Sequence, residues 1–521
     1  MKPRILPIIF MEVNMKYILA HDIGTSGNKA TVFDENGAMV ASEVHAYGAR
    51  YFNETWVEQD PHDWWEAICV STNKLIKRTG IDAKSIAVVS FSGQMMGCLC
   101  VDRQGNPLRN SIIWADQRAQ KQTAALGEKM PLKKQYNITG HRNAASYGIQ
   151  KLMWVRDNEP DIYKNTYKAL NAKDYITLKL TGVFMTEPTD ADSFACMDLR
   201  SNQWSAPIVE ASGIDESKLP DIMPSTHVAG YVTRDAALET GLHPGTPVVL
   251  GGGDGICANV GAGSVRPGKT YCSLGSSSWV ATTSEQPVLD EEMRTVCWAH
   301  IVPGYYSPNG TMQTGGGAYS WLKSNVCRQE TEEAARLGIS PYQLINEQIE
   351  KSPPGANGVL FLPYLLGERA PRWSATARAA FLGVKMENTR GDLLRSVLEG
   401  ITMNLALIFN VLNKQTKIDE LLIIGGGAKG AVWAQIIADI FGVRALIPQV
   451  LEEATSMGAA VTGGVGVGIF KDFDIIDQMI RITASYEPKP ETRKTYDRSM
   501  RLFDKSYKAL EEVHRDMAEQ A

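Results

Sequence analysis

The sequence predicts an α/β fold with domains on either side of a central cleft, and three observations support this. Short apolar strands alternate with helical segments along the chain. The chain has 521 residues, enough for two or three hydrophobic cores at about 100–200 residues each. Gly24–Thr31 also aligns with Gly275–Thr282, and four of the eight residues coincide. If this likeness marks a duplication, each half presents a hairpin of small residues to a shared cleft.

The first half begins as a β-hairpin. An apolar strand, Lys16–Ala20, runs into the motif Asp22-Ile-Gly-Thr-Ser-Gly, and a second strand, Lys29–Phe33, follows. The turn Asp34-Glu-Asn-Gly then predicts a third strand, Ala38–Ala46, because Asn-Gly between apolar runs is a strong turn signal.

A helix and two further strands complete this half. Asp60-Pro61 provides an N-cap and a first-turn proline, and Gly80 ends the predicted helix. Ile86–Phe91 and Gly97–Val101 are apolar strands, with the turn Gly93-Gln-Met-Met between them.

The pattern restarts in the second half. Val248–Gly253 is a predicted strand with Asp254 at its end, and Thr270–Leu274 is a strand that leads into a second small-residue turn. An apolar strand, Leu421–Ile424, enters a glycine loop and a helix. The predicted boundaries are an N-terminal extension at 1–14, an N-terminal domain at 15–247, a C-terminal domain at 248–485 and a helical tail at 486–521.

The composition argues against several classes of protein. With 53 Lys+Arg and 58 Asp+Glu the formal charge is −5, so we expect no nucleic-acid or anionic-membrane partner. No apolar run reaches the length of about 18 residues that a membrane span needs. The eight cysteines include no C-x-x-C pair, which favours free thiols in a reducing cytoplasm. The histidines lack the spacing of a zinc site.

One glycine motif fits a P-loop by its letters only. Gly263-Ser-Val-Arg-Pro-Gly-Lys-Thr matches the pattern, but a P-loop must follow a strand and open a helix. Here a helical segment precedes the motif, a strand follows it, and Pro267 removes an amide donor. The sequence therefore predicts no P-loop.

A second glycine motif has the context of a nucleotide site. Gly425-x-Gly427-x-x-Gly430 lies between an apolar strand and an apolar helix, and the acidic residues Glu452 and Glu453 follow it. We expect this loop to bind a nucleotide. An NAD-dependent oxidoreductase is the alternative, although such folds carry the loop after their first strand rather than late in the chain.

The first hairpin and Asp254 carry the chemistry of phosphoryl transfer. The hairpin's glycines allow close approach of a ligand, while Thr25, Ser26 and Lys29 suit phosphate oxygens. Asp22 can hold Mg²⁺, usually through water. Asp254 can approach a substrate hydroxyl and accept its proton. The alternatives are a plain β-turn for the hairpin and a helix N-cap for Asp254.

The chain resembles the FGGY carbohydrate kinases of the actin-like ATPase superfamily, most closely the xylulokinases, from about Tyr17 to Phe470. The resemblance implies two ribonuclease-H-like domains that close on ATP and a sugar. The resemblance rests on the motifs Asp22-Ile-Gly-Thr-Ser-Gly, Trp56-Val-Glu-Gln-Asp-Pro, Gly93-Gln-Met, Trp114-Ala-Asp-Gln-Arg, Lys173-Asp-Tyr, Gly251-Gly-Gly-Asp, Leu274-Gly-Ser-Ser, Leu362-Pro-Tyr-Leu-x-Gly-Glu-Arg, Glu399-Gly and Ile424-Gly-Gly-Gly-Ala.

Matched residue by residue, the resemblance implies a role for single positions. Asp254 falls on the catalytic base and Asp22 on the metal-associated carboxylate, so Asp22 and Asp254 are the expected metal site for Mg²⁺. The implied ATP contacts are Asp22, Thr25, Ser26, Lys29, Gly275, Ser276, Gly316, Ser320, Gly426 and Gly427. The implied sugar side is Gln94, Met95, Met96, Asp116 and Asp254, with core packing as the alternative for the first four. A homodimer is a further expectation from the family.

Two departures concern the substrate. Xylulokinases usually carry Met-His where this chain has Met95-Met96, and Asp-Asn where it has Asp254-Gly255. Pockets that bind hydroxyls through such groups discriminate strongly. The sequence predicts an ATP-dependent kinase for a primary hydroxyl of a small ketose or polyol, first D-xylulose to D-xylulose 5-phosphate, then ribulose, erythritol or erythrulose. A non-catalytic sugar-sensing regulator is the rival.

Overall fold

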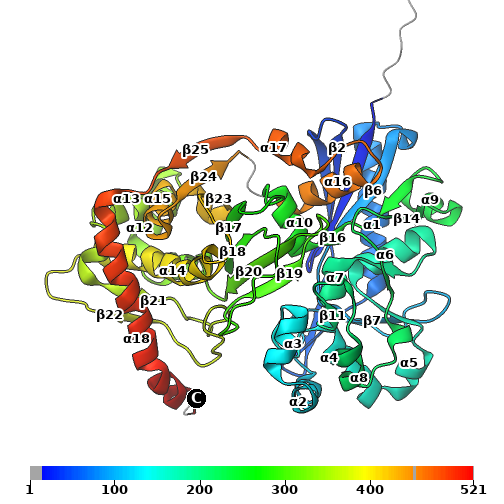
Figure 1. The fold of residues 1–521 in the computed structure, drawn as a ribbon. Helices are drawn as coiled ribbons and strands as arrows, with labels where there is room; N and C mark the ends of the chain where they lie inside the picture. The colour runs from blue at the N-terminus through cyan, green and yellow to red at the C-terminus, as the bar shows by residue number, and fades with distance from the viewer. Residues whose placement is uncertain (1–14, 450–452, 520–521) are drawn as a thin grey trace, which may run out of the picture.

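The computed structural model describes residues 15–449 and 453–519 as two bodies, each built on a seven-stranded sheet (Figure 1). The predicted extension at 1–14 and Glu452 lie outside the described residues.

The first sheet has the order β14-β15-β6-β1-β2-β3, and β16 pairs with β6. β1 is antiparallel to β2, β2 is antiparallel to β3, and β1 is parallel to β6. These strands are β1 (Tyr17–Ile23), β2 (Gly27–Asp34), β3 (Met39–Ala46), β6 (Ile86–Gly93), β14 (Val228–Tyr231), β15 (Pro247–Val249) and β16 (Gly252–Gly253).

The second sheet, of order β19-β20-β18-β17-β23-β24-β25, matches the first over five neighbouring strands, with β20, β18, β17, β23 and β24 in the places of β3, β2, β1, β6 and β15. β17 and β18 form the hairpin, β20 is antiparallel to β18, and β23 is parallel to β17. The strands are β17 (Thr270–Leu274), β18 (Ser278–Thr282), β19 (Val296–Ala299), β20 (Tyr306–Met312), β23 (Glu420–Ile424), β24 (Arg444–Pro448) and β25 (Ile482–Tyr486). The repeat supports the predicted duplication, and the α/β fold class is confirmed.

The predicted helix after the first three strands is α1 (Pro61–Thr79). The Asp60 side chain accepts a hydrogen bond from the His62 amide at the helix start, and Gly80 ends the helix at a φ of 69°. Its buried face, which includes Trp64 and Ile68, packs in the core of the first body.

One predicted strand is divided, and it lies in a different body from the one expected. The segment Val248–Gly253 forms β15 and β16, which are interrupted at Gly251, where φ is +72°. Both strands pair with β6, so they complete the first sheet instead of opening the second domain. The helix that follows, α10 (Asp254–Gly261), packs against α16 (Ala454–Gly466), and α16 also packs on β1 and β6. A late segment of the chain therefore helps to build the first body.

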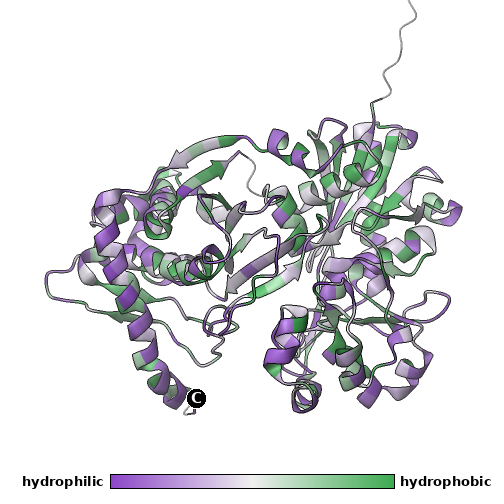
Figure 2. Ribbon diagram, in the orientation of Figure 1, coloured by the Kyte–Doolittle hydropathy of each residue, from purple (hydrophilic) through white to green (hydrophobic). Residues whose placement is uncertain are grey.

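The second body is built around a buried helix, α14 (Arg390–Asn413). By length and composition alone this helix could cross a membrane, but 83% of its apolar window is buried inside the protein. The predicted tail helix is α18 (Arg493–Glu519), which buries Tyr496, Phe503 and Tyr507. Figure 2 shows hydrophobic residues concentrated along the strands of the sheets and many hydrophilic residues along α18.

Candidate functional site

Asp22 lies near the end of β1, where two hydroxyl groups fix its carboxylate. The Ser92 hydroxyl donates to Oδ1 at 2.7 Å, and the Thr455 hydroxyl donates to Oδ2 at 2.7 Å. Ser92 belongs to β6 and Thr455 to α16, so strand pairing and the late helix together orient Asp22.

Asp254 is the first residue of α10, and Gly253 occupies the N-cap position. Its Oδ1 accepts a hydrogen bond from the Gly255 amide at 2.7 Å. Burial raises the pKa of Asp254 to about 7, and the negative charge of Asp22 adds to this rise. The two carboxylates therefore lie near enough for their charges to interact, although one comes from the first strand and the other from a helix more than two hundred residues later.

This arrangement fits a divalent cation. Two neighbouring carboxylates repel each other, and a bound Mg²⁺ would relieve that repulsion. Both oxygens of Asp22 and Oδ1 of Asp254 accept hydrogen bonds from neutral donors, which leaves both groups able to act as metal ligands or as acceptors of metal-bound water.

The first hairpin turns between β1 and β2 and is fastened by side chains. Inside the turn, the Gly24 amide donates to the Gly27 carbonyl at 3.0 Å. The Tyr47 hydroxyl donates to the Gly24 carbonyl at 2.6 Å, and the Trp114 indole donates to the Thr25 hydroxyl at 2.9 Å. The Ser26 side chain is exposed at the tip, as a phosphate-binding hydroxyl must be.

Lys29 follows this turn and forms an ion pair. Its Nζ lies 3.3 Å from the carboxylate of Glu453. A phosphate at the hairpin would therefore compete with Glu453 for the ammonium group.

The second hairpin borders a cavity of about 810 Å³ in the second body. All six second-body positions that the resemblance implied for ATP line this one cavity: Gly275, Ser276, Gly316, Ser320, Gly426 and Gly427. Further lining comes from α11 (Gly316–Asn325), α13 (Pro341–Glu350) and α15 (Ala431–Phe441). The aromatic residues Tyr319, Tyr342 and Trp433 supply an apolar wall that could hold a base.

Close backbone packing shapes the polar end of this cavity. The Gly316 amide donates to the Gly275 carbonyl at 2.8 Å, and the Gly315 and Gly317 amides donate to the Ser276 carbonyl at 2.9 and 3.0 Å. A Cβ at Gly316 would lie 2.6 Å from the Gly275 carbonyl oxygen, so only glycine fits here. The Ser276 side chain stays exposed at the tip of the hairpin.

The four residues expected on the sugar side divide into two groups. Met95 packs against Gly253, where an added Cβ would lie 2.6 Å from the Met95 sulfur, and Met96 follows it with a φ of +58°. Gln94 instead donates its amide to Gln59 Oε1 at 2.7 Å. Asp116 is fully buried and paired with Arg118 at 2.7 Å. The ion pair holds Asp116 inside the protein, and Gln94 braces the first hairpin through the Gly24 carbonyl at 3.3 Å, so the sugar contacts of these two residues stay predictions.

The sequence analysis missed a set of polar side chains beside the Met95-Met96 turn. The Tyr147 hydroxyl lies 3.2 Å from His141 Nδ1, and His141 Nε2 lies 3.1 Å from Asp192 Oδ1. The Lys151 ammonium donates to the Met96 carbonyl at 2.6 Å and to the Ser146 carbonyl at 2.6 Å, which places Tyr147 beside the Met95-Met96 turn. These residues carry no recognisable spacing, so no sequence signal could have found them.

The chain is similar to known proteins over most of its length. Residues 17–261 match the profile of the FGGY family of carbohydrate kinases, N-terminal domain, and residues 270–467 match that of the C-terminal domain.

Relatives with different substrates in their names match about equally well. Gluconokinase from Bacillus licheniformis is 30% identical over 504 residues, which are 96% of this chain and 98% of that protein. Xylulose kinase from Bacillus subtilis (strain 168) is 31% identical over 495 residues, which are 95% and 97% of the two chains. The crystal structure of gluconate kinase from Lactobacillus acidophilus has a TM-score of 0.88 and 27% identity, covering 95% of this chain and 98% of that one.

Proposed function

We propose the function of this chain from its family, because the chain belongs to the FGGY family of carbohydrate kinases. It is therefore a phosphotransferase that acts on a small-molecule sugar, and the NAD-dependent oxidoreductase is excluded. The finer proposal is ATP-dependent phosphorylation of a primary hydroxyl on a small ketose or polyol, with D-xylulose first. A cytoplasmic location and a homodimer stay predictions.

Asp254 acts as the general base in this proposal. The observation that carries it is the position of Asp254 at the start of α10, where burial first, and then the negative charge of Asp22, raises its pKa to about 7. A base is most effective when its pKa lies near the working pH. Asp254 accepts the proton of the substrate hydroxyl as that oxygen attacks the γ-phosphorus in line, and the bond from phosphorus to the bridging oxygen of ADP breaks.

The two hairpins hold the phosphates in this proposal. Thr25 and Ser26 contribute from the first body, and Gly275 and Ser276 from the second, while the cavity beside α13 takes the adenosine. Asp22 and Asp254 would hold Mg²⁺, which would supply positive charge to offset the phosphate charge. Orientation and charge neutralisation are the main tasks of a protein in phosphoryl transfer.

A sugar acid is a second candidate, and two arginines favour it. Burial raises the pKa of Tyr147, Asp192 adds to the rise, and Arg369 and Arg142 oppose it, so both guanidinium groups lie near enough to Tyr147 for their charges to act on it. Arg142 belongs to the first body and Arg369 to the second. Guanidinium groups suit a carboxylate such as that of gluconate. Similar proteins named gluconokinase and gluconate kinase also support a sugar acid as the substrate.

The test is ADP release from MgATP with D-xylulose, D-ribulose, erythritol, erythrulose and D-gluconate. We expect one substrate far above the rest, and Asp254→Asn to lower its kcat by about 10²–10⁴-fold with nucleotide binding intact. The exposed-turn variant Asp102→Asn is the matched control and should behave as wild type. Asp254→Asn activity above a tenth of wild type would remove Asp254 from the role of base. If ATP binds but no substrate gives ADP release, the sugar-sensing regulator is favoured.

A further inference from the structure

The segment that carries Asp254 has no side chains of its own with which to hold its place. Gly251, Gly252 and Gly253 run between β15 and α10. An added Cβ at Gly251 would lie 2.0 Å from the Phe91 carbonyl oxygen, so the segment passes directly against β6. Its position must therefore be fixed by hydrogen bonds to its backbone from neighbouring elements.

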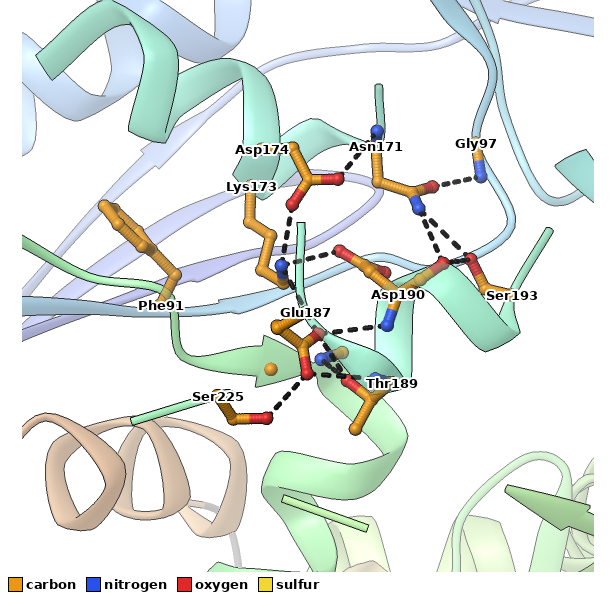
Figure 3. A network of polar contacts seen from close by, with 12 residues as sticks. Phe91, Gly97, Asn171, Lys173, Asp174, Glu187, Thr189, Asp190, Ser193 and Ser225 are labelled. Atoms are coloured by element: carbon orange, nitrogen blue, oxygen red, sulfur yellow. Dashed lines mark hydrogen bonds and ion pairs between the residues drawn. The ribbon is translucent and has the colours of Figure 1, made fainter. Parts of the chain in front are cut away.

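Both ends of this glycine segment are bonded to groups that converge on one carboxylate, that of Glu187. At one end, the Gly253 amide donates to the Thr189 hydroxyl at 2.8 Å, and that hydroxyl donates to Glu187 Oε1 at 2.6 Å. At the other end, the Gly251 amide donates to the Ser225 carbonyl at 3.0 Å, and the Ser225 hydroxyl donates to Glu187 Oε2 at 2.7 Å. Figure 3 shows Glu187 between Thr189 and Ser225.

Glu187 is itself held from three directions. It is the N-cap residue of α7 (Pro188–Asp192), and its side chain accepts from the Thr189 amide at 2.9 Å and from the Asp190 amide at 3.0 Å. The ammonium group of Lys173, from α6 (Ala172–Thr181), lies 3.3 Å from Glu187 Oε1. Glu187 and Lys173 are fully buried, so the cluster does not itself contact the substrate cleft.

Lys173 is surrounded by three buried carboxylates. Lys173 Nζ also lies 2.8 Å from Asp174 Oδ1 and 3.1 Å from Asp190 Oδ2 (Figure 3). Burial works against the charge of Lys173, but the three carboxylates hold its pKa well above the usual range. Burial raises the pKa of Asp190 strongly. Of the three carboxylates around Lys173, Glu187 is the one that accepts from the hydroxyl groups of Thr189 and Ser225, which lead to the glycine segment.

A buried cluster of this kind contributes little net stability compared with apolar packing. Its hydrogen bonds are directional, however, and both residues whose hydroxyl groups donate to Glu187 also accept a hydrogen bond from a backbone amide of the segment that precedes Asp254. Misplacement of a catalytic group by about 1 Å costs on the order of 100-fold in rate, so such fixation matters most for the chemical step.

We propose that Glu187 and Thr189 are positioning residues that set the place of Asp254 through the backbone of Gly251–Gly253. The inference rests on the proposed role of Asp254 as the base. The buried charged cluster around Lys173 and Glu187, which binds neither the sugar nor the nucleotide, thereby has a role in positioning the base.

The decisive variants are Thr189→Val and Thr189→Ser. Valine has nearly the same shape but removes the hydroxyl that joins the Gly253 amide to Glu187, whereas serine keeps that hydroxyl. We expect Thr189→Val to lower kcat by about 10–100-fold, with KM for ATP unchanged, and Thr189→Ser to remain within about threefold of wild type. Equal loss in both variants, or a loss expressed in KM for ATP alone, would overturn the proposal.

Ser225→Ala tests the second arm of the network in a variant that keeps the backbone bond to Gly251. It should lower kcat by about 3–10-fold, less than Thr189→Val, because only the link from Ser225 to Glu187 is lost. Wild-type kcat in Thr189→Val, together with an inactive Asp254→Asn, would overturn this inference and leave the proposed function intact. An active Asp254→Asn would overturn both.

Discussion

The two hairpins have the same place in their sheets but are held and charged in different ways. In the first, Asp22 on β1 pairs across the ladder with Lys29 on β2. In the aligned sequence Asp22 corresponds to Ser273, which pairs with Trp279 in the second hairpin. The first hairpin therefore brings charge to the cleft, and the second brings only backbone and hydroxyl groups.

Their support differs as well. Side chains far away in sequence fasten the first turn, among them Tyr47, Gln59 and Trp114. Backbone amides at the start of α11 fasten the second. A turn held by side chains can be loosened in steps by substitution, whereas a turn held by close backbone contact tolerates no added atom. The two hairpins thus differ in role, with charge and adjustable side-chain contacts at the first and a rigid backbone cradle at the second.

Asp22→Ser gives the first hairpin the residue of the second and should have the largest effect. We expect kcat to fall by about 100-fold or more, because a metal-associated carboxylate is lost. The pH profile should also move. Asp254 works only when ionised, so kcat/KM in the wild type should fall as pH drops through about 7, where Asp254 gains its proton.

Removal of the negative charge of Asp22 lowers the pKa of Asp254, so the acid limb of Asp22→Ser should shift to lower pH. The control is Ser273→Ala at the corresponding position of the second hairpin, which should keep both the wild-type kcat and the wild-type acid limb of the pH profile. An unchanged limb in Asp22→Ser would contradict the charge coupling between the two carboxylates.

Gly316→Ala tests the rigid cradle. The added methyl group would lie 2.6 Å from the Gly275 carbonyl oxygen, so the hairpin or the start of α11 must shift. We expect KM for ATP to rise by about 10–100-fold while KM for the sugar changes little. Gly48→Ala is the matched control, since a Cβ there meets nothing within 4 Å. Equal kinetics for both variants would show that the cradle is not rigid.

The same contrast explains what the sequence could predict. Local signals predicted both hairpins, α1 and the glycine loop at 425–430, because turns and caps depend on neighbours in the chain. The role of Gln94 and Asp116 depended on Gln59 and Arg118 as partners, and partner choice follows from tertiary packing. The domain boundary near Val248 depended on which sheet a short strand joins, and strand partners are not local.

Gln59→Leu should loosen the first hairpin in an intermediate way. Gln59 donates to the Thr25 carbonyl at 2.7 Å and accepts from Trp64 at 3.1 Å and Gln94 at 2.7 Å. Its loss leaves buried donors unpaired, at a cost of about 1–3 kcal/mol in the free energy of unfolding. We expect KM for ATP to rise by about 3–10-fold, measured beside denaturant unfolding.

The control for that change is Gln122→Leu. Gln122 is a buried residue of α2 (Gln120–Lys129), and its side-chain amide donates to Asp157 at 2.9 Å. The control variant should share the loss of stability but keep the wild-type KM. A raised KM in both variants would mean that stability, and not the hairpin, sets ATP affinity.

Trp114→Phe should have the smallest effect, because it removes one hydrogen bond at a partly exposed site. The Trp114 indole donates to the Thr25 hydroxyl at 2.9 Å, and the side chain is 40% exposed. Water can replace the lost donor, so we expect KM for ATP to change by about twofold with kcat unchanged. Trp204→Phe removes an equivalent bond, to the Pro220 carbonyl at 2.9 Å, away from the hairpin and should leave KM as it is. A tenfold effect of Trp114→Phe would mean that the Thr25 hydroxyl needs this donor to meet a phosphate, and the first hairpin would then be as intolerant as the second.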